Sequence, residues 1–201
     1  MLFGQLLVAG IALGAIYAII GMGFALIFNT KSVFDISFGG VFILAGYLSA
    51  FLMMEAGFPV PVSIVIVLAF SFLVGSVIEI GIMRPLRKRG SSHLVYLFVS
   101  FGILTVMEAI GILVWHGKTM LSRAPGAAHI LQFGPFSISD VKVAGIIIAI
   151  IVLSVLWLFL RRTRLGITMR AIFDNPVRAR TIGANIEQVY LISSALGNMV
   201  A

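Results

Sequence analysis

Long apolar runs separated by short polar connections dominate the chain. These runs cover residues 4–28, 38–54, 62–83, 93–115, 141–160 and 189–201. A helix that crosses the hydrocarbon core of a bilayer needs roughly 20 apolar residues. The first five runs approach or exceed that length, whereas the sixth stops after about 13 residues. The pattern predicts an all-α integral membrane protein, a polytopic helical bundle that is C-terminally truncated within its sixth span.

Composition supports lipid as the main solvent of this chain. Of its 201 residues, 61% are hydrophobic and only 10% are charged, whereas soluble domains carry about 25% charged residues. The first apolar run lacks a basic start and is too long for the core of a signal peptide, so we expect it to remain as a span. The sequence contains no cysteine, which excludes disulfides, thiolate metal sites and a cysteine nucleophile.

The basic residues divide unequally between the two sets of connections. One set carries eleven, namely Lys31, Arg84, Arg87, Lys88, Arg89, Arg161, Arg162, Arg164, Arg170, Arg178 and Arg180. The other set carries only Lys118, Arg123 and Lys142. Because Lys and Arg concentrate in cytoplasmic loops, we expect the first set in the cytoplasm and the N-terminus outside. The short basic loops indicate a multi-pass protein of the cell (inner) membrane in contact with lipid, without a nucleic-acid partner.

An acid and two adjacent glycines follow the first run. Asp35, Ser37, Phe38, Gly39 and Gly40 lie between two apolar segments. Glycine pairs and acids are unfavourable in a continuous membrane helix, and broken backbone in a membrane needs protein or a water-filled cavity around it. The segment therefore predicts an interrupted helix facing the bundle interior. An ordinary turn at the membrane surface accounts for it equally well.

Two glutamates stand inside apolar runs. Glu108 lies within the fourth run, where an acid costs roughly 2.5–3.5 kcal/mol on insertion scales. We therefore expect Glu108 to point away from lipid, towards a solute path or another helix. Glu79 lies nearer the end of the third run, and we expect it to pair with Arg84 or to reach the membrane surface.

Residues 161–188 form a basic segment that contains the signals of a short helix. Asn175 is a good N-cap, Pro176 suits the first helical position, and Gly183 suits the residue after the end. These residues predict a helix over residues 176–182 and a second helix start at Asn185. A short capped helix between two spans suits docking to a partner, or binding of anionic lipid at the surface.

Signals of enzymatic chemistry are missing from the sequence. It contains no phosphate-binding loop of the GxxxxGK[ST] type, no HExxH and no GxSxG. Its three histidines, His93, His116 and His129, lack the spacing of metal ligands. We expect neither a catalytic residue nor a bound metal or cofactor.

The order of these features resembles the permease subunits of branched-chain amino acid ABC transporters. The resemblance covers nearly the whole chain and rests on four places: residues 14–19 with 23–28, residues 35–40 with 44–48, residues 83–87, and residues 162–166 with 169–171, 174, 179 and 183–185. The fourth place is the most specific, because it joins a basic span end to the predicted short helix.

The resemblance implies partners and roles. A second permease subunit would enclose the path, an extracellular or periplasmic protein would deliver the solute, and two cytoplasmic subunits would bind and hydrolyse ATP. Residues near the path would be Asp35, Ser37, Phe38, Gly39, Gly40, Gly46 and Tyr47. Glu108 is a further candidate, because an acid within a span should point away from lipid. Residues coupling to the ATPase would be Asp174, Asn175, Pro176, Arg178, Ala179 and Gly183.

The sequence alone identifies neither the transported solute nor the energy source. Phe38 stands where the family usually carries a polar residue, often His or Gln, so branched-chain amino acids, urea, short amides and other amino acids all stay possible. A transporter driven by an ion gradient often shows internal repeats, and none is convincing here. A membrane protein with a purely structural role would need neither Glu108 nor the capped helix.

Overall fold

The computed structural model describes residues 2–115, 130–133, 136–181 and 183–200. Lys118 and Arg123, two of the basic residues expected outside the cell, lie outside the described residues. The elements, in order, are α1 (Leu2–Lys31), α2 (Ser37–Met54), α3 (Val60–Ile78), the π-helix η1 (Glu79–Met83), α4 (Arg84–Lys88), α5 (His93–Trp115), β1 (Ile130–Phe133), β2 (Phe136–Ser139), α6 (Asp140–Arg162), α7 (Arg164–Asp174), α8 (Pro176–Thr181) and α9 (Ile186–Val200).

Within the described residues, five helices are long and apolar enough to cross a membrane. They cover Ala9–Lys31, Ser37–Met54, Val60–Lys88, His93–Trp115 and Val143–Arg162. Their outer faces carry large apolar side chains in the open, such as Leu13, Val65 and Leu113. Water could not solvate so much apolar surface, and a helix satisfies its backbone polar groups internally, as lipid requires. The fold is the polytopic membrane bundle that the sequence predicts.

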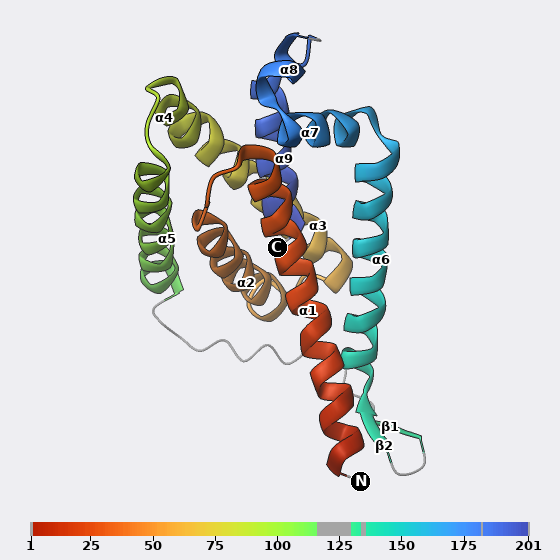
Figure 1. The fold of residues 1–201 in the computed structure, drawn as a ribbon. Helices are drawn as coiled ribbons and strands as arrows, with labels where there is room; N and C mark the ends of the chain where they lie inside the picture. Colours follow the sequence, from red (N-terminus) through yellow and green to blue (C-terminus); the bar gives the residue numbers. More distant parts are fainter. Residues whose placement is uncertain (1, 116–129, 134–135, 182, 201) are drawn as a thin grey trace.

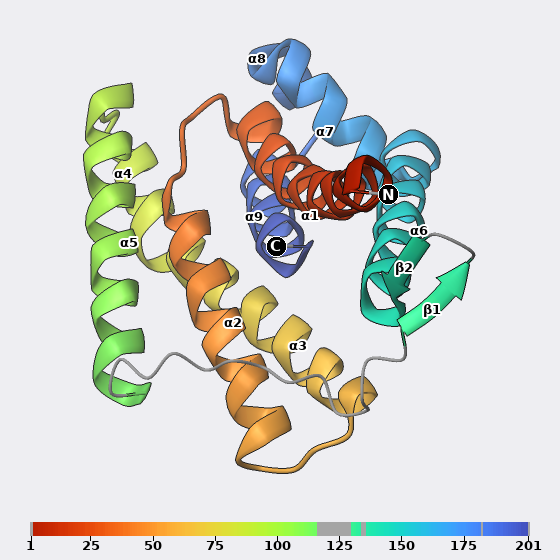
Figure 2. The ribbon, with the colours of Figure 1, turned by 90° about the horizontal axis from the view of Figure 1, so that it is seen from below.

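Helix α9 lies at the centre of this bundle. It packs against α1 on one side and α3 on the other, and α2 separates α3 from the peripheral α5 (Figures 1 and 2). Small residues permit the closest crossing: a Cβ on Gly23 of α1 would lie 2.8 Å from the carbonyl oxygen of Gly197 in α9. Close packing of this kind is the usual source of helix association in lipid.

The expected interruption around Gly39 and Gly40 is wrong. The chain turns over residues 32–36, and both glycines then lie inside the continuous helix α2. Gly40 serves packing, because a Cβ there would lie 2.9 Å from the sulfur of Met107 in α5. The alternative reading, a turn between two helices, describes the segment. The β1–β2 hairpin is a further element that the sequence did not predict, in the connection between the fourth and fifth apolar runs.

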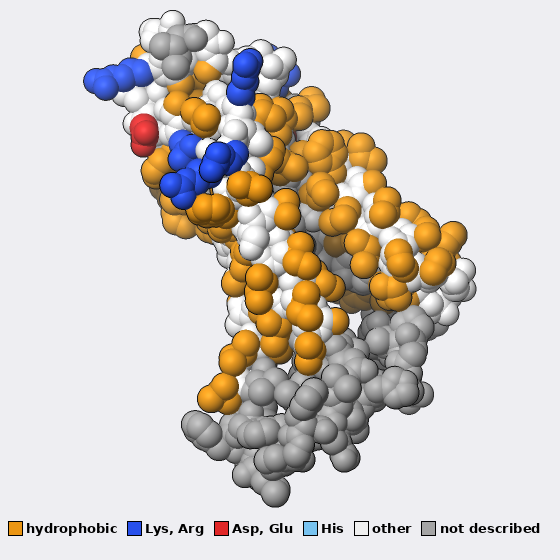
Figure 3. All heavy atoms as spheres, turned by 90° about the vertical axis from the view of Figure 1, so that its right-hand side faces the viewer, with side chains coloured by type: hydrophobic (Ala, Val, Ile, Leu, Met, Phe, Trp, Pro, Cys, Tyr) orange, Lys and Arg blue, Asp and Glu red, His pale blue; other side chains and the backbone are white. Residues whose placement is uncertain are grey.

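The ends of α1, α4, α7 and α8 gather at one end of the molecule, which we call the basic end (Figure 1). Lys and Arg side chains cluster there, whereas apolar side chains cover the flank beneath them (Figure 3). Helix α7 turns away from the axis of α6, and α8 projects beyond the apolar helices.

Candidate functional site

The segment α7–α8–α9 begins at a sharp corner after α6. The Thr163 hydroxyl accepts a hydrogen bond from the backbone N–H of Gly166 at 3.0 Å and so caps α7. Gly166 is required at this corner, because a Cβ there would lie 2.5 Å from the Cα of Leu160. The corner thus directs α7 across the basic end instead of continuing α6.

Helix α8 has the caps that the sequence predicts. The side-chain oxygen of Asn175 accepts a hydrogen bond from the N–H of Arg178 at 3.0 Å, and Pro176 is the first helical residue. Gly183 follows the helix with a φ of +87°, in the left-handed region that glycine adopts easily. Asn185 caps α9 by accepting from the N–H of Gln188 at 3.2 Å.

Helix α8 has a buried side and an outward side. Ala179 is buried in an apolar cluster with Met169, Ile172 and Tyr190, and so anchors α8 to the bundle. Val177 is 72% exposed, and Arg178 and Arg180 are also exposed. Asp174 ends α7 in an exposed position. The residues of α8 available to a partner therefore include Val177 and the two arginines, while Ala179 holds the helix in place.

A cluster of charges underlies this segment where α1, η1 and α4 meet α9. The Glu79 carboxylate, 1% exposed, pairs with the Lys31 ammonium and, at 2.7 Å, with the Arg87 guanidinium. The ammonium of Lys31 also donates to the hydroxyl of Ser194 in α9 at 3.0 Å and lies 3.8 Å from the Asp35 carboxylate. These contacts join α1, the π-helix and α9.

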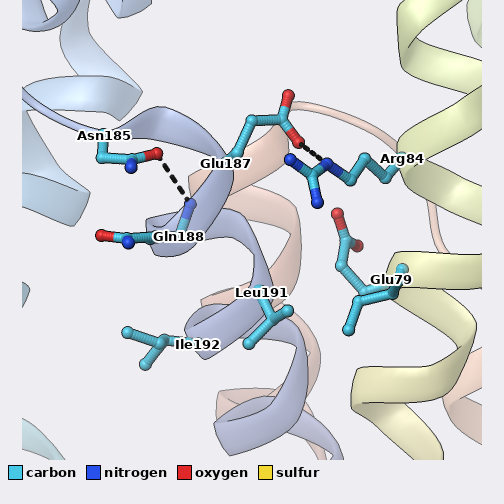
Figure 4. A pocket seen from close by; sticks show the side chains of 8 residues that line it. Glu79, Arg84, Asn185, Glu187, Gln188, Leu191 and Ile192 are labelled. Carbon is cyan, nitrogen blue, oxygen red and sulfur yellow. Dashed lines mark hydrogen bonds and ion pairs between the residues drawn. The ribbon is translucent and has the colours of Figure 1, made fainter.

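The same cluster reaches the start of α9 through Glu187. Its carboxylate lies 3.1 Å from Arg87 and 3.1 Å from the Nε of Arg84. Figure 4 shows Arg84 extending from α4 towards Glu187, with Glu79 beside it. The Arg87 guanidinium also lies over the Tyr190 ring, 4.5 Å from its centroid. We call Lys31, Asp35, Glu79, Arg84, Arg87 and Glu187 the ion-pair cluster.

The cluster holds three cations and three anions. Its formal charge is therefore zero, which lets charged groups lie among apolar helices at tolerable cost. The expected partner of Glu79 was wrong, since Glu79 binds Lys31 and Arg87 while Arg84 binds Glu187. Helices α3, η1 and α4 form one continuous run over Val60–Lys88. Within this run Arg87 contacts Glu79, eight residues earlier, while Arg84 contacts Glu187 of α9.

The acid of the predicted path segment is buried and locally bonded. The Asp35 carboxylate, 3% exposed, accepts hydrogen bonds from the hydroxyl and, at 3.2 Å, from the N–H of Ser37. It thereby holds the first turn of α2. Phe38 is buried beside it, with its ring edge-on to Phe24 at 6.3 Å between centroids. The described residues show this segment as a packed joint between α1 and α2.

The remaining path residues point in different directions. Tyr47 stacks on Trp115 of α5 at 5.4 Å between ring centroids. Gly46 instead lines a groove of about 300 Å³ between α2 and α3, together with Ser49, Ser63 and Ser71. Glu108 is exposed on α5, away from the face that packs on α2 through Met107 and Gly111. Within the described residues these side chains do not converge on one cavity.

Sequence reasoning missed the partners of Glu79. Lys31 lies 48 residues away from Glu79 and Glu187 lies 100 residues away from Arg87, so no helical spacing links them. The one available signal was the position of Glu79 within an apolar run. A carboxylate there needs a cationic partner, but the sequence does not identify which residue provides it. Among the described residues, no group of three or more His, Asp or Glu could hold a metal ion.

A bundle of apolar helices with a capped, projecting helical segment at its basic end is the architecture of a polytopic membrane protein. The family model for the permease component of branched-chain amino acid transport systems matches residues 6–201. The chain therefore belongs to this permease family and is a multi-pass membrane protein.

Relatives in the family carry names for different solutes. A probable branched-chain amino acid transport permease of Methanocaldococcus jannaschii is 24% identical over 91% of this chain and 59% of its own. A high-affinity branched-chain amino acid permease of Pseudomonas aeruginosa is 26% identical over 98% and 67%. A galactofuranose transporter permease of Escherichia coli is 27% identical over 92% and 50%. No solved structure gives a significant match.

These alignments cover 50% to 67% of the relatives' own lengths. The chain thus spans half to two thirds of the length of these relatives, and the part matched by the family model includes the α7–α8–α9 segment.

Proposed function

We propose that this chain is part of the permease subunit of an ATP-driven importer for branched-chain amino acids or a related small polar solute. The observation that carries the proposal is α8, a capped helix that projects from the basic end with Val177, Arg178 and Arg180 outward. Membership in the permease family supports the same role. The permease itself performs no catalysis in this proposal, and ATP is used by separate subunits.

The proposal assigns an orientation and a set of partners. The basic end lies in the cytoplasm and the N-terminus outside, following the charge bias of the connections. Two ATPase subunits dock on the coupling helices of the permease pair, and α8 is the coupling helix of this chain. A second permease subunit completes the path, and an external binding protein delivers the solute. Asp174, Asn175, Pro176, Ala179 and Gly183 shape and anchor α8, while Arg178 contacts the ATPase.

The ion-pair cluster suits the transmission of movement from α8 to the bundle. Glu187 lies at the start of α9, directly after α8, and pairs with Arg84 and Arg87 of α4. Glu79 continues the chain of contacts to Lys31 at the end of α1. Charged contacts with defined geometry can couple two arrangements of packed helices, so a shift of α8 reaches three helices at once.

The path is proposed to run beside α2 and α5. Asp35, Ser37, Phe38, Gly39 and Gly40 lie at the joint between α1 and α2, and Gly46 and Tyr47 lie in the middle of α2. Glu108 lies on the face of α5 that points away from α2 and lines the path where the second permease covers that face. Exposure of Glu108 in the single chain supports this placement, because a carboxylate within a span needs a polar surrounding.

Charge reversal at Arg178 tests the coupling role. The full-length permease with its ATPase and binding protein is reconstituted, and uptake is measured together with ATP hydrolysis. Arg178→Glu should reduce uptake about tenfold or more, because an inverted charge at a docking surface costs several kcal/mol. Insertion and thermal stability should stay unchanged, since Arg178 is exposed. Arg170→Glu on α7, also exposed, is the matched control.

Uptake that stays unchanged in Arg178→Glu would argue against coupling through α8.

Uptake assays with labelled leucine, urea, polar amino acids, fructose and galactofuranose identify the solute class, since relatives carry both amino acid and sugar names. Uptake that survives removal of the ATPase but stops when the ion gradient is dissipated would instead indicate an ion-coupled transporter.

A further inference from the structure

A groove of about 410 Å³ lies between α4 and α8 at the basic end. Arg87 and Lys88 of α4 form one wall, Pro176, Val177 and Arg180 of α8 form the other, and Ile186, Glu187 and Tyr190 lie between them. Two elements that are about 90 residues apart in the sequence thus enclose one surface.

Two of its three cations are unpaired. Arg87 already binds Glu79 and Glu187 and covers the ring of Tyr190. Glu187, the one acid lining the groove, is already shared between Arg84 and Arg87. Within the described residues, the side chains of Lys88 and Arg180 form no ion pair, so the groove keeps positive charge that no described residue neutralises.

The walls also offer apolar contact. Pro176 is exposed, and Val177 is 72% exposed at the outer side of α8. An apolar side chain with cations on both sides fits a protein segment that carries an acid next to an apolar residue. A lipid headgroup is less suited, because α8 projects beyond the ends of the apolar helices (Figure 1).

We propose that the groove between α4 and α8 is a second part of the ATPase docking surface and receives an acidic segment of that subunit through Lys88 and Arg180. This inference rests on the proposed function and adds α4 to it. Docking on two elements would let the ATPase sense and change the separation of α4 from α8. Glu187 and Arg87, which line the groove, would pass that change to the ion-pair cluster.

Site-directed photocrosslinking tests the groove. Residues 1–201 contain no cysteine, so a short photoreactive maleimide can be placed at single positions once any cysteine elsewhere in the full-length permease is replaced by serine. Probes at Lys88→Cys and Arg180→Cys report the groove. A probe at Arg178→Cys, on α8 but outside the groove lining, reports the proposed function alone. Arg162→Cys, exposed at the end of α6, is the background control.

We expect Lys88→Cys and Arg180→Cys to form adducts with an acidic peptide of the ATPase in the assembled transporter. Adducts at Arg178→Cys but not at Lys88→Cys would overturn the groove and leave coupling through α8 intact. No adduct at any of these three positions would overturn both proposals. Adducts of Lys88→Cys with lipid would identify a lipid site and overturn the groove as a protein surface.

Charge reversal gives an independent readout. Lys88→Glu should weaken ATPase binding about tenfold or more, while Arg89→Glu, its exposed neighbour outside the groove, should have little effect. The difference should shrink at about 1 M salt, where screening shortens the range of charges to about 3 Å. Equal effects of both substitutions would show that general surface charge, and not the groove, recruits the ATPase.

Discussion

Lys31 and Glu79 illustrate how single charged residues are tolerated among apolar helices. Each is nearly fully buried, at 5% and 1% exposure of the side chain, and each has more than one polar partner. A buried charge without a partner is costly, whereas a fully paired one is close to neutral. A substitution of one member of the ion-pair cluster should therefore lower the stability of the protein far more than a double substitution that removes a cation and its anion together.

Glu79→Gln should therefore destabilise the protein strongly. The substitution leaves Lys31 and Arg87 facing a neutral amide, and removing one partner of a buried pair costs about 3–5 kcal/mol. Thermal unfolding of the purified protein in detergent should show a clear fall in Tm. The double variant Lys31→Met with Glu79→Gln removes one charge of each sign and should recover part of the loss.

Glu55→Gln is the matched control, because Glu55 is exposed and forms no ion pair within the described residues. If Glu79→Gln and Glu55→Gln had the same Tm, Glu79 would not depend on its buried partners, and the ion-pair cluster would lose its role.

At the scale of elements, local signals decided what could be predicted from sequence. Asn175, Pro176 and Gly183 act within a few residues of each other, and α8 forms where they predict it. The glycines at 39 and 40 were misread because they face α5, which lies far along the chain: Gly39 faces Leu104, and Gly40 packs closely on Met107. Lys31, the partner of Glu79 in α1, escaped for the same reason, because it lies 48 residues away. Long apolar runs revealed the spans, but not their packing order.

The corner between α6 and α7 offers a sharp test of element geometry. In Gly166→Ala, the added methyl group would lie 2.5 Å from the Cα of Leu160, so backbone must move. Such strain usually costs about 1–3 kcal/mol or more. We expect lower Tm and faster hydrogen exchange in α7, because the Thr163 cap is displaced. Gly145→Ala in α6, where a methyl group meets nothing within 4 Å, should be harmless.

Equal stability of Gly166→Ala and Gly145→Ala would show that the corner is more open than its geometry indicates, and that α7 is not fixed by it.

At the scale of the whole molecule, the fold and the charge pattern predict the same membrane topology. The end of α4 and the end of α6 lie at the same end of the bundle, although more than 70 residues separate them (Figure 1). Both carry arginines, so the membrane potential and anionic lipids should hold them on the cytoplasmic side. Helix α2 runs away from the basic end, so the turn that follows it lies at the opposite end of the bundle. This turn should face the outside of the cell.

Single cysteines in this cysteine-free stretch can measure that arrangement directly. In intact cells, a membrane-impermeant maleimide should label Glu55→Cys, and it should label Arg89→Cys and Arg162→Cys only after permeabilisation. All three positions are exposed, so differences in labelling report the side of the membrane instead of burial. Since ATP is available only in the cytoplasm, labelling of Arg89 and Arg162 from opposite sides would leave α4 and α8 unable to bind one ATPase. That result would remove the docking surface and the coupling role together, whatever the family of the chain.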